Sequence, residues 1–170
     1  PEILHRLNHG EKQVMLTEFD KHERYSTETR IEANKALAYV NIMKGCDKYC
    51  TYCIVPFTRG REKSRMIDEV VEDIVKLVKQ GVREVTLLGQ NVNSFGKGNV
   101  ATQIREPREL HNCIGKVGPD SGEENFPQLL RVLEEDPRLG ALKRIRFTSL
   151  HPLDFSDELI DLRDTKFFFR

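Results

Sequence analysis

Three cysteines lie close together in the segment GCDKYCTYCIVPFTRGRE, which runs from residue 45 to residue 62. Cys46, Cys50 and Cys53 form a C-x3-C-x2-C array, and the fourth cysteine of the chain, Cys113, stands far away from them. Thiolates are soft ligands that suit zinc and iron–sulfur clusters. The array therefore predicts a metal centre in this loop, with three protein ligands and one open position.

The spacing leaves more than one kind of centre open. A closed structural zinc site needs four donors, commonly in C-x2-C pairs, and the triad has no Cys-rich or His-rich partner nearby to complete one. His22 and Cys113 are the candidates for a fourth ligand, although neither has a characteristic spacing. An iron–sulfur cluster held by three Cys leaves one iron free for a substrate or cofactor, and the spacing favours it over zinc. Three unconnected thiols are the remaining alternative.

Composition limits the class of protein. The chain has 170 residues, of which 38% are hydrophobic and 32% charged, as is typical of one soluble globular domain. No apolar run approaches the ~20 residues of a membrane helix, and no basic-then-apolar signal sequence opens the chain. Clustered thiols favour a reducing compartment and a metal over disulfides. We therefore expect a cytoplasmic protein with no membrane partner.

The charge pattern does not by itself identify a partner. The formal net charge is zero, so any contact with a nucleic acid has to come from a local patch. Basic residues do bracket the cysteines: Lys44, Lys48, Arg59, Arg61, Lys63 and Arg65. On charge alone, a solvated loop is the favoured interpretation of this group.

A buried strand leads into the cysteine loop, and an amphipathic helix follows the loop. The strand is ALAYVNIM, residues 36–43. Ser64 is placed to cap the helix, acidic residues at 68–69 suit the positive end of its dipole, and Gly81 ends it. Its apolar residues recur at helical spacing: Ile67, Val70, Val71, Ile74 and Val78.

Further elements alternate along the rest of the chain. VREVTLLGQN (82–91) contains a continuous apolar run that is typical of a parallel strand covered on both faces. Residues 92–124 read as an irregular insertion or mobile loop. A second helix, with apolar residues at 126, 129, 130 and 133, ends at Asp136–Pro137. A third strand spans 142–149, and Ser156 caps a third helix in which Phe155 and Ile160 form a hydrophobic staple.

Alternating strands and helices predict right-handed crossovers and a parallel sheet, hence an α/β fold. Functional groups in such sheets gather at the carboxyl ends of the strands. The cysteine loop, GQN (89–91) and TSLHP (148–152) each follow a strand. We therefore expect these three segments to share one edge of the sheet.

These residues resemble a known family. The C-x3-C-x2-C array after the first strand, with Tyr52 before its last Cys, resembles the radical S-adenosylmethionine (SAM) superfamily. GCDKYCTYCIVPFTRGREKSR, EVTLLGQNVNSFG and RIRFTSLHPLDF resemble its methylthiotransferases, above all the branch that methylthiolates N6-isopentenyladenosine beside the tRNA anticodon. The resemblance covers about residues 36–162. It implies the first half of a partial (β/α)6 TIM-like barrel with parallel strands.

The resemblance also implies a chemistry. Cys46, Cys50 and Cys53 would hold a [4Fe–4S] cluster whose open iron chelates SAM. Reductive cleavage of SAM would yield a 5′-deoxyadenosyl radical that abstracts hydrogen from adenine C2, where the methylthio group is installed. A second SAM would supply the methyl group and a second cluster the sulfur. The implied partners are tRNA and an electron donor such as flavodoxin or ferredoxin.

The remaining site residues follow from the same resemblance. The backbone of Tyr52 would lie near the SAM adenine, with simple packing as the alternative role. Gly89, Gln90 and Asn91 stand at the strand end where the superfamily holds the SAM amino group, although GQN departs from its Gly-Gly-Glu form. Ser149 lies at the third strand end, and His151 is not assigned catalysis.

The sequence departs from the family in its extent. The family has an upstream domain with three more cysteines for the second cluster, whereas residues 1–35 contain none. We expect residues 1–35 to be the end of that N-terminal domain and a linker, and 36–170 a truncated radical SAM core. A C-terminal RNA-binding domain is also expected to be missing, so the isolated chain should be inactive on tRNA.

Three rival functions stay open at this point. Methylthiotransferases that act on threonylcarbamoyl-adenosine or on a ribosomal protein share the triad and the chemistry. A zinc-stabilised nucleic-acid-binding module is the rival from another class. The open ligand position and the net neutrality both disfavour the zinc module.

Overall fold

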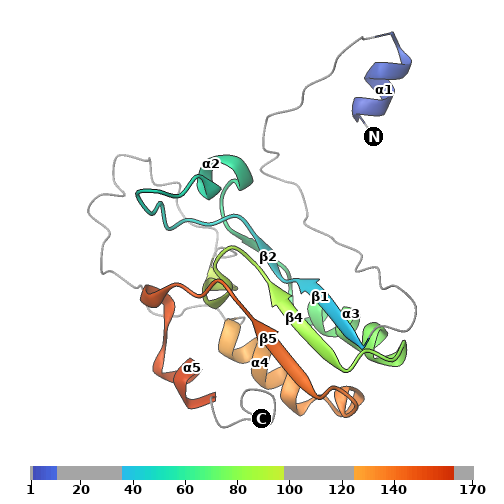
Figure 1. The fold of residues 1–170 in the computed structure, drawn as a ribbon, viewed down its shortest axis with the longest axis vertical. Coiled ribbons are helices and arrows are strands. Elements are labelled where there is room, and N and C mark those ends of the chain that lie inside the picture. Colours follow the sequence, from blue (N-terminus) through green and yellow to red (C-terminus); the bar gives the residue numbers. More distant parts are fainter. Residues whose placement is uncertain (1, 11–35, 98–124, 163–170) are drawn as a thin grey trace.

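The computed structural model describes residues 2–10, 36–97 and 125–162 (Figure 1). Of the segment predicted to be a linker and the end of another domain, only residues 2–10 are described, and they contain helix α1 (Glu2–Asn8). That domain assignment therefore stays a prediction. In the described part of the chain no helix is both long and apolar enough to cross a membrane.

Three parallel strands form the main sheet. They are β1 (Leu37–Asn41), β4 (Glu84–Leu88) and β5 (Arg144–Phe147), in the order β1-β4-β5. Ala38 pairs with Val85, which in turn pairs with Ile145. The sheet confirms the predicted α/β class, and β4 is its central strand.

Helices α3 (Ile67–Lys79) and α4 (Phe126–Glu135) cover one face of this sheet. α3 packs on β1, and α4 contacts α3 (Figure 1). On the opposite face Tyr39 is 57% exposed, and Glu84 forms ion pairs with the exposed Arg144 and Arg146 of β5. Thr86 of β4 lies on this same face and is 7% exposed, so the central residues of β4 are buried on both faces, as predicted.

Helix α3 confirms the predicted periodicity but not the predicted cap. The five apolar residues at helical spacing are buried, and the helix ends before Gly81, whose φ of +101° favours glycine. The N-cap is Met66, not Ser64. The reason is that Ser64 belongs to β3 (Lys63–Ser64), which pairs with β2 (Met43–Lys44), and its hydroxyl accepts the N–H of Gly96 (2.9 Å).

The second and third predicted helices are present. In α4 the Asn125 side chain caps the helix by accepting the N–H of Gln128 (2.8 Å), and a short 3-10 turn, η4 (Pro137–Leu139), follows. In α5 (Asp157–Asp161) Ser156 accepts the N–H of Leu159 (3.2 Å), as predicted. Phe155 and Ile160 remain 48% and 46% exposed, so the proposed staple buries little surface.

The segment after β4 differs from the prediction. Residues 92–97 were expected to begin an irregular insertion, but Val92 and Phe95 are fully buried and a 3-10 turn, η1 (Val92–Ser94), packs against α4. This turn is fixed because its apolar side chains complete the core above the carboxyl end of β4. The rest of that predicted loop, with Cys113, lies outside the described residues.

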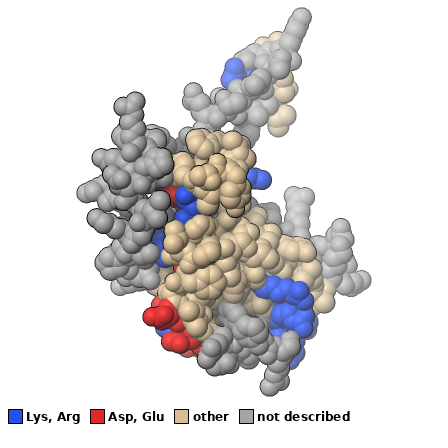
Figure 2. Space-filling view, turned by 60° about the vertical axis from the view of Figure 1, so that its left-hand side comes forward, with Lys and Arg blue, Asp and Glu red and all other residues tan. Residues whose placement is uncertain are grey.

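Basic side chains gather in one place on the face shown in Figure 2. The largest group of Lys and Arg lies together at the lower right of that view, and smaller groups lie near the middle and at the top. The expectation that any nucleic-acid contact depends on a local patch stays a prediction.

Candidate functional site

The three cysteines lie in the loop between β2 and α2 (Val55–Arg59). Cys46 is buried, Cys50 and Cys53 are half-buried, and all three are free thiols. The start of the loop lies against the segment that follows α2. Gly45 has φ +75°, and the Cys46 N–H donates to Gly60 O (3.3 Å). A Cβ on Gly45 would lie 2.2 Å from the Arg61 carbonyl oxygen, so this close approach requires glycine.

The far half of the loop makes a tight turn. The Cys53 N–H donates to Cys50 O (2.9 Å), and Tyr49 has a positive φ of 48° while its ring packs edge-on against Phe57 (5.9 Å between centroids). Tyr52 is 92% exposed. Its predicted position near the SAM adenine therefore stays a prediction.

The chemistry of the donor set fits an iron–sulfur group. Cys46, Cys50 and Cys53 supply three soft thiol donors within one short loop, although among the described residues no three His, Cys, Asp or Glu side chains are gathered around a common point. Burial, with the negative charges of Glu62, Asp47 and Cys50 adding to it, raises the pKa of the Cys46 thiol. Metal binding would therefore have to displace a proton from Cys46. His22 and Cys113 lie outside the described residues.

The GQN segment supports this loop directly. Gln90 Oε1 accepts the Gly45 N–H (2.6 Å), which ties the end of β4 to the start of the cysteine loop. Asn91 is 2% exposed and donates Nδ2 to Asp154 Oδ2 (2.7 Å), while its own Oδ1 has no hydrogen-bond partner. Beside Gly89, an added Cβ would meet the Met43 side chain at 2.5 Å.

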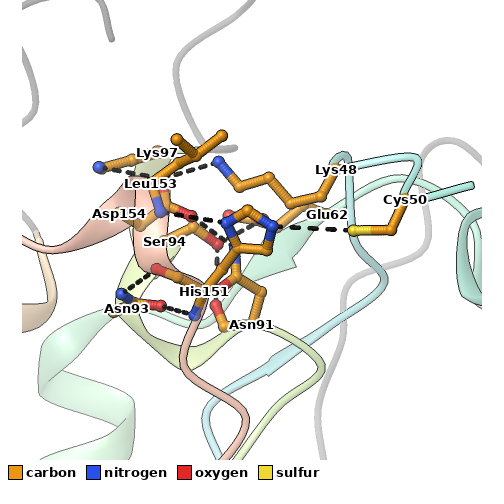
Figure 3. Close-up of polar contacts among 10 residues, drawn as sticks. All are labelled: Lys48, Cys50, Glu62, Asn91, Asn93, Ser94, Lys97, His151, Leu153 and Asp154. Carbon is orange, nitrogen blue, oxygen red and sulfur yellow. Dashed lines mark hydrogen bonds and ion pairs between the residues drawn. The ribbon is translucent and has the colours of Figure 1, made fainter. Parts of the chain in front are cut away.

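The TSLHP segment contacts the cysteine loop and the turn that follows GQN. The Ser149 carbonyl, on a residue with φ +60°, accepts the Val92 N–H (3.2 Å). His151 is held by Asn93 and lies beside Cys50, with 3.7 Å between Nε2 and Sγ (Figure 3). The prediction that the cysteine loop, GQN and TSLHP share one edge of the sheet is therefore confirmed.

A buried charge network at this edge was not predicted from the sequence. Asp154, whose side chain is 3% exposed, pairs with Lys48 of the cysteine loop (2.7 Å) and with Lys97 (3.5 Å) (Figure 3). Although burial by itself raises its pKa, hydrogen bonds from Lys48 and Asn91 and the two lysine charges lower the pKa of Asp154 overall. An LDF tripeptide carries no local signal for such a role.

A second buried carboxyl lies in the same network. Glu62 is 7% exposed and accepts a hydrogen bond from the Ser94 hydroxyl at Oε2 (2.6 Å), while Oε1 has no hydrogen-bond partner. Burial raises the pKa of Glu62 to about 8, against the smaller lowering effect of the Ser94 hydrogen bond. Glu62 belongs to the TRGRE block, but no role for it was predicted from the sequence.

The basic residues of the loop do not act as one group. Arg61 pairs with Asp47 (2.8 Å) and is half exposed, while Arg59 ends α2 at the surface. Arg65 is buried and donates to the Asn41 carbonyl (3.1 Å) and to Asp73 (2.7 Å). Arg65 therefore serves the fold by joining β1 to α3.

Comparison with known proteins places this geometry in a family. The sequence model of the Radical SAM superfamily matches residues 40–115, which include the cysteine loop and GQN. The chain is 40% identical over 97% of its length to a tRNA-2-methylthio-N(6)-dimethylallyladenosine synthase of Mannheimia succiniciproducens. It is 41% identical over 94% of its length to the same-named protein of Aliivibrio fischeri, and 40% identical over 95% to that of Ralstonia pickettii.

The match extends through the whole of this chain but not through the relatives. The chain spans 30%, 29% and 32% of the lengths of these three proteins. Residues beyond the superfamily match, including the TSLHP segment, are within the aligned region because the alignments cover nearly the whole chain. Residues 40–115 of the chain therefore belong to the radical SAM superfamily.

Proposed function

We propose that this chain is the cluster-binding part of a radical SAM methylthiotransferase that modifies C2 of N6-isopentenyladenosine beside the tRNA anticodon. One observation carries the proposal: the cysteine loop, GQN and TSLHP are joined by hydrogen bonds at one edge of a parallel sheet. The 40% identity to tRNA-2-methylthio-N(6)-dimethylallyladenosine synthases supports the choice of substrate.

Cys46, Cys50 and Cys53 would hold a [4Fe–4S] cluster with one iron open to SAM. When bound and reduced, the cluster supplies the electron that cleaves SAM into methionine and a 5′-deoxyadenosyl radical. The protein's own contribution is to position these groups and keep water away. The backbone N–H of the buried Glu62 donates to Asp47 of the loop (3.3 Å), and the Ser94 hydroxyl joins Glu62 to Asn91, so these contacts help to position the loop.

The GQN and TSLHP segments would hold SAM. Gln90 uses its carbonyl oxygen on Gly45, which leaves its amide nitrogen for a ligand. Asn91 Oδ1 is a buried acceptor without a partner, and such a group is costly unless a donor reaches it. An N–H of the cofactor suits that acceptor. Gly89, Ser149 and the backbone of Tyr52 are proposed as further contacts.

The partners and location follow from the same proposal. The substrate would be tRNA, and the electron would come from a donor such as flavodoxin or ferredoxin. A second [4Fe–4S] cluster would supply the sulfur from a domain that these residues do not include. Three free thiols persist in a reducing environment, which suits a cytoplasmic location.

SAM cleavage tests the proposal. The chain is reconstituted anaerobically with iron and sulfide, then incubated with SAM and a strong reductant, and 5′-deoxyadenosine is quantified by mass spectrometry. We expect slow release from the wild type and none from Cys50→Ala. A reconstituted chain that carries the full cluster but releases no 5′-deoxyadenosine would contradict the proposal.

The same samples test whether methylthiolation of tRNA needs a second cluster as the source of sulfur. Added tRNA should yield no methylthiolated nucleoside, because the chain contains no other cysteine array to hold a sulfur-donating cluster. Product formed by this chain alone would show that the expected second cluster is not needed.

A further inference from the structure

We propose that His151 tunes the cysteine-bound cluster by donating a hydrogen bond from its Nε2–H to the sulfur of Cys50. This role goes beyond the proposed function and rests on it, because the tuned group is the cluster that the three cysteines would hold. His151 is a positioning residue in this proposal and takes no part in the bond-breaking steps.

The first support is the contact itself. His151 Nε2 lies 3.7 Å from Cys50 Sγ, which is within hydrogen-bond range for sulfur, across a sequence separation of 101 residues (Figure 3). Both side chains are part-buried, so bulk water competes for the contact less than it would at the surface. The contact singles out one of the three ligands, because no hydrogen bond joins His151 to Cys46 or Cys53 among the described contacts.

The second support is the fixed backbone of His151. Asn93 holds it from both sides: its Oδ1 accepts the His151 N–H (2.9 Å) and its Nδ2 donates to the His151 carbonyl (2.9 Å). Asn93 is 3% exposed and lies in the buried turn η1. This double contact also fixes the orientation of the Asn93 amide, because the reverse orientation would place donor against donor.

The third support is the tautomer of the ring. The Leu153 backbone N–H points at His151 Nδ1 (3.3 Å), and a backbone N–H can only donate. Nδ1 is therefore the acceptor nitrogen in this hydrogen bond, and in that tautomer the ring proton is carried by Nε2. The nitrogen that faces Cys50 is thus the donor.

An N–H···S bond of this kind has a defined electronic consequence. Hydrogen bonds to the sulfurs of an iron–sulfur cluster are among the determinants of its reduction potential. The donated hydrogen stabilises negative charge on sulfur, and the reduced cluster carries one more electron than the oxidised one. The bond therefore favours the reduced state and raises the midpoint potential.

The redox arm of the test uses three variants of the reconstituted chain. His151→Phe removes the donor, His151→Gln keeps an N–H donor of similar reach, and His9→Phe changes an exposed histidine just after α1 as a control. Midpoint potentials are measured by redox titration monitored by electron paramagnetic resonance. We expect His151→Phe to shift the potential to more negative values, His151→Gln to recover part of the shift, and His9→Phe to leave it unchanged.

The structural arm needs no cluster. In the metal-free chain, nitrogen–proton correlation spectra of the imidazole rings report which nitrogen of His151 carries the proton. We expect the Nε2–H tautomer, and a predominant Nδ1–H tautomer would overturn the proposal. Failure of the wild type to bind iron would count against the proposed function and leave this arm to decide the contact on its own.

Two outcomes of the redox titration would contradict the proposed role of His151 without contradicting the proposed function. One is an unchanged potential in His151→Phe with a full complement of iron. The other is loss of iron in His151→Phe as complete as in Cys50→Ala, which would make His151 a ligand in place of a donor to one.

Discussion

Lys48 and Asp154, 106 residues apart in the chain, are joined by an ion pair of 2.7 Å between Lys48 Nζ and Asp154 Oδ1. The pair connects the cysteine loop to the turn that follows β5. Asp154 also accepts from Asn91 at the end of β4, so one buried carboxylate contacts both the cysteine loop and the GQN segment. We conclude that Asp154 is the main polar anchor of the loop.

Asp154→Asn should lower the free energy of unfolding by about 2 kcal/mol at pH 7. Removing one partner of a fully buried pair costs about 3–5 kcal/mol. We expect the lower cost of about 2 kcal/mol here because Lys48 and Lys97 are 24% and 31% exposed, so water screens their charges. Urea unfolding followed by circular dichroism measures it. Asp161→Asn, at the exposed end of α5, is the control and should change the stability by less than about 0.5 kcal/mol.

The Asp154 effect should depend on pH in a defined direction. Its pKa is lowered in the folded chain, so its stabilising contribution is present above the unfolded value of 3.8 and is lost as pH falls through the folded value. The difference between wild type and Asp154→Asn should therefore shrink in strongly acidic solution. A difference that stays constant from pH 7 to the acid limit would show that the charge of Asp154 is not what stabilises the loop.

The stability difference between the wild type and Glu62→Gln should depend on pH in the opposite direction, growing as the pH rises. An unfolded glutamate titrates near 4.5, whereas burial raises the pKa of Glu62 to about 8 in the folded chain. The folded state then binds the proton more tightly, so stability falls as pH rises from about 4.5 to about 8. The size of this shift corresponds to at most about 5 kcal/mol.

Urea unfolding of the metal-free chain at pH 5 and pH 8.5 measures this effect. We expect Glu62→Gln to match the wild type within about 1 kcal/mol at pH 5 and to exceed it by more than about 2 kcal/mol at pH 8.5. Glu135→Gln, at the exposed end of α4, should follow the wild type at both values. Equal stabilities of wild type and Glu62→Gln at pH 8.5 would mean that Glu62 ionises without penalty.

Replacing two glycines with positive φ by Ala distinguishes the cost of backbone strain from the cost of steric crowding. Gly81→Ala adds a Cβ that meets nothing within 4 Å, so it should cost only the strain of about 1 kcal/mol. Gly45→Ala adds the same strain and a Cβ 2.2 Å from the Arg61 carbonyl oxygen, so we expect about 3 kcal/mol in all. Urea unfolding midpoints compare the stability of the two variants. Equal losses of stability would show that the fold does not require the close approach of Gly45 to residues 60–61.

The fold could be predicted because its signals are local. The apolar spacing in α3 and α4 determines which helix faces are buried, and the Val85–Leu88 run indicates a strand buried on both faces. The parallel topology then places every segment that follows a strand at the same edge. For that reason the meeting of the cysteine loop, GQN and TSLHP was predictable before any distance was known.

The polar contacts of the site could not be predicted in the same way. Asp154 and Ser94 look like ordinary loop residues, and their roles depend on partners at Lys48 and Glu62 in other segments. The capping error at Ser64 has the same origin, because its hydroxyl bonds to Gly96, which is distant in sequence. The role of His151 likewise depends on a contact with Cys50 that is visible only in three dimensions.

The central claim is that Cys46, Cys50 and Cys53 hold a [4Fe–4S] cluster. Its most direct test is the iron and acid-labile sulfide content of the chain after anaerobic reconstitution, together with the visible absorption. We predict a brown protein with about four iron and four sulfide per chain, lost when any one of the three cysteines is replaced by Ala and retained in Cys113→Ala. A colourless protein that binds zinc, or a Cys113→Ala variant that loses its iron as completely as Cys50→Ala, would contradict the account.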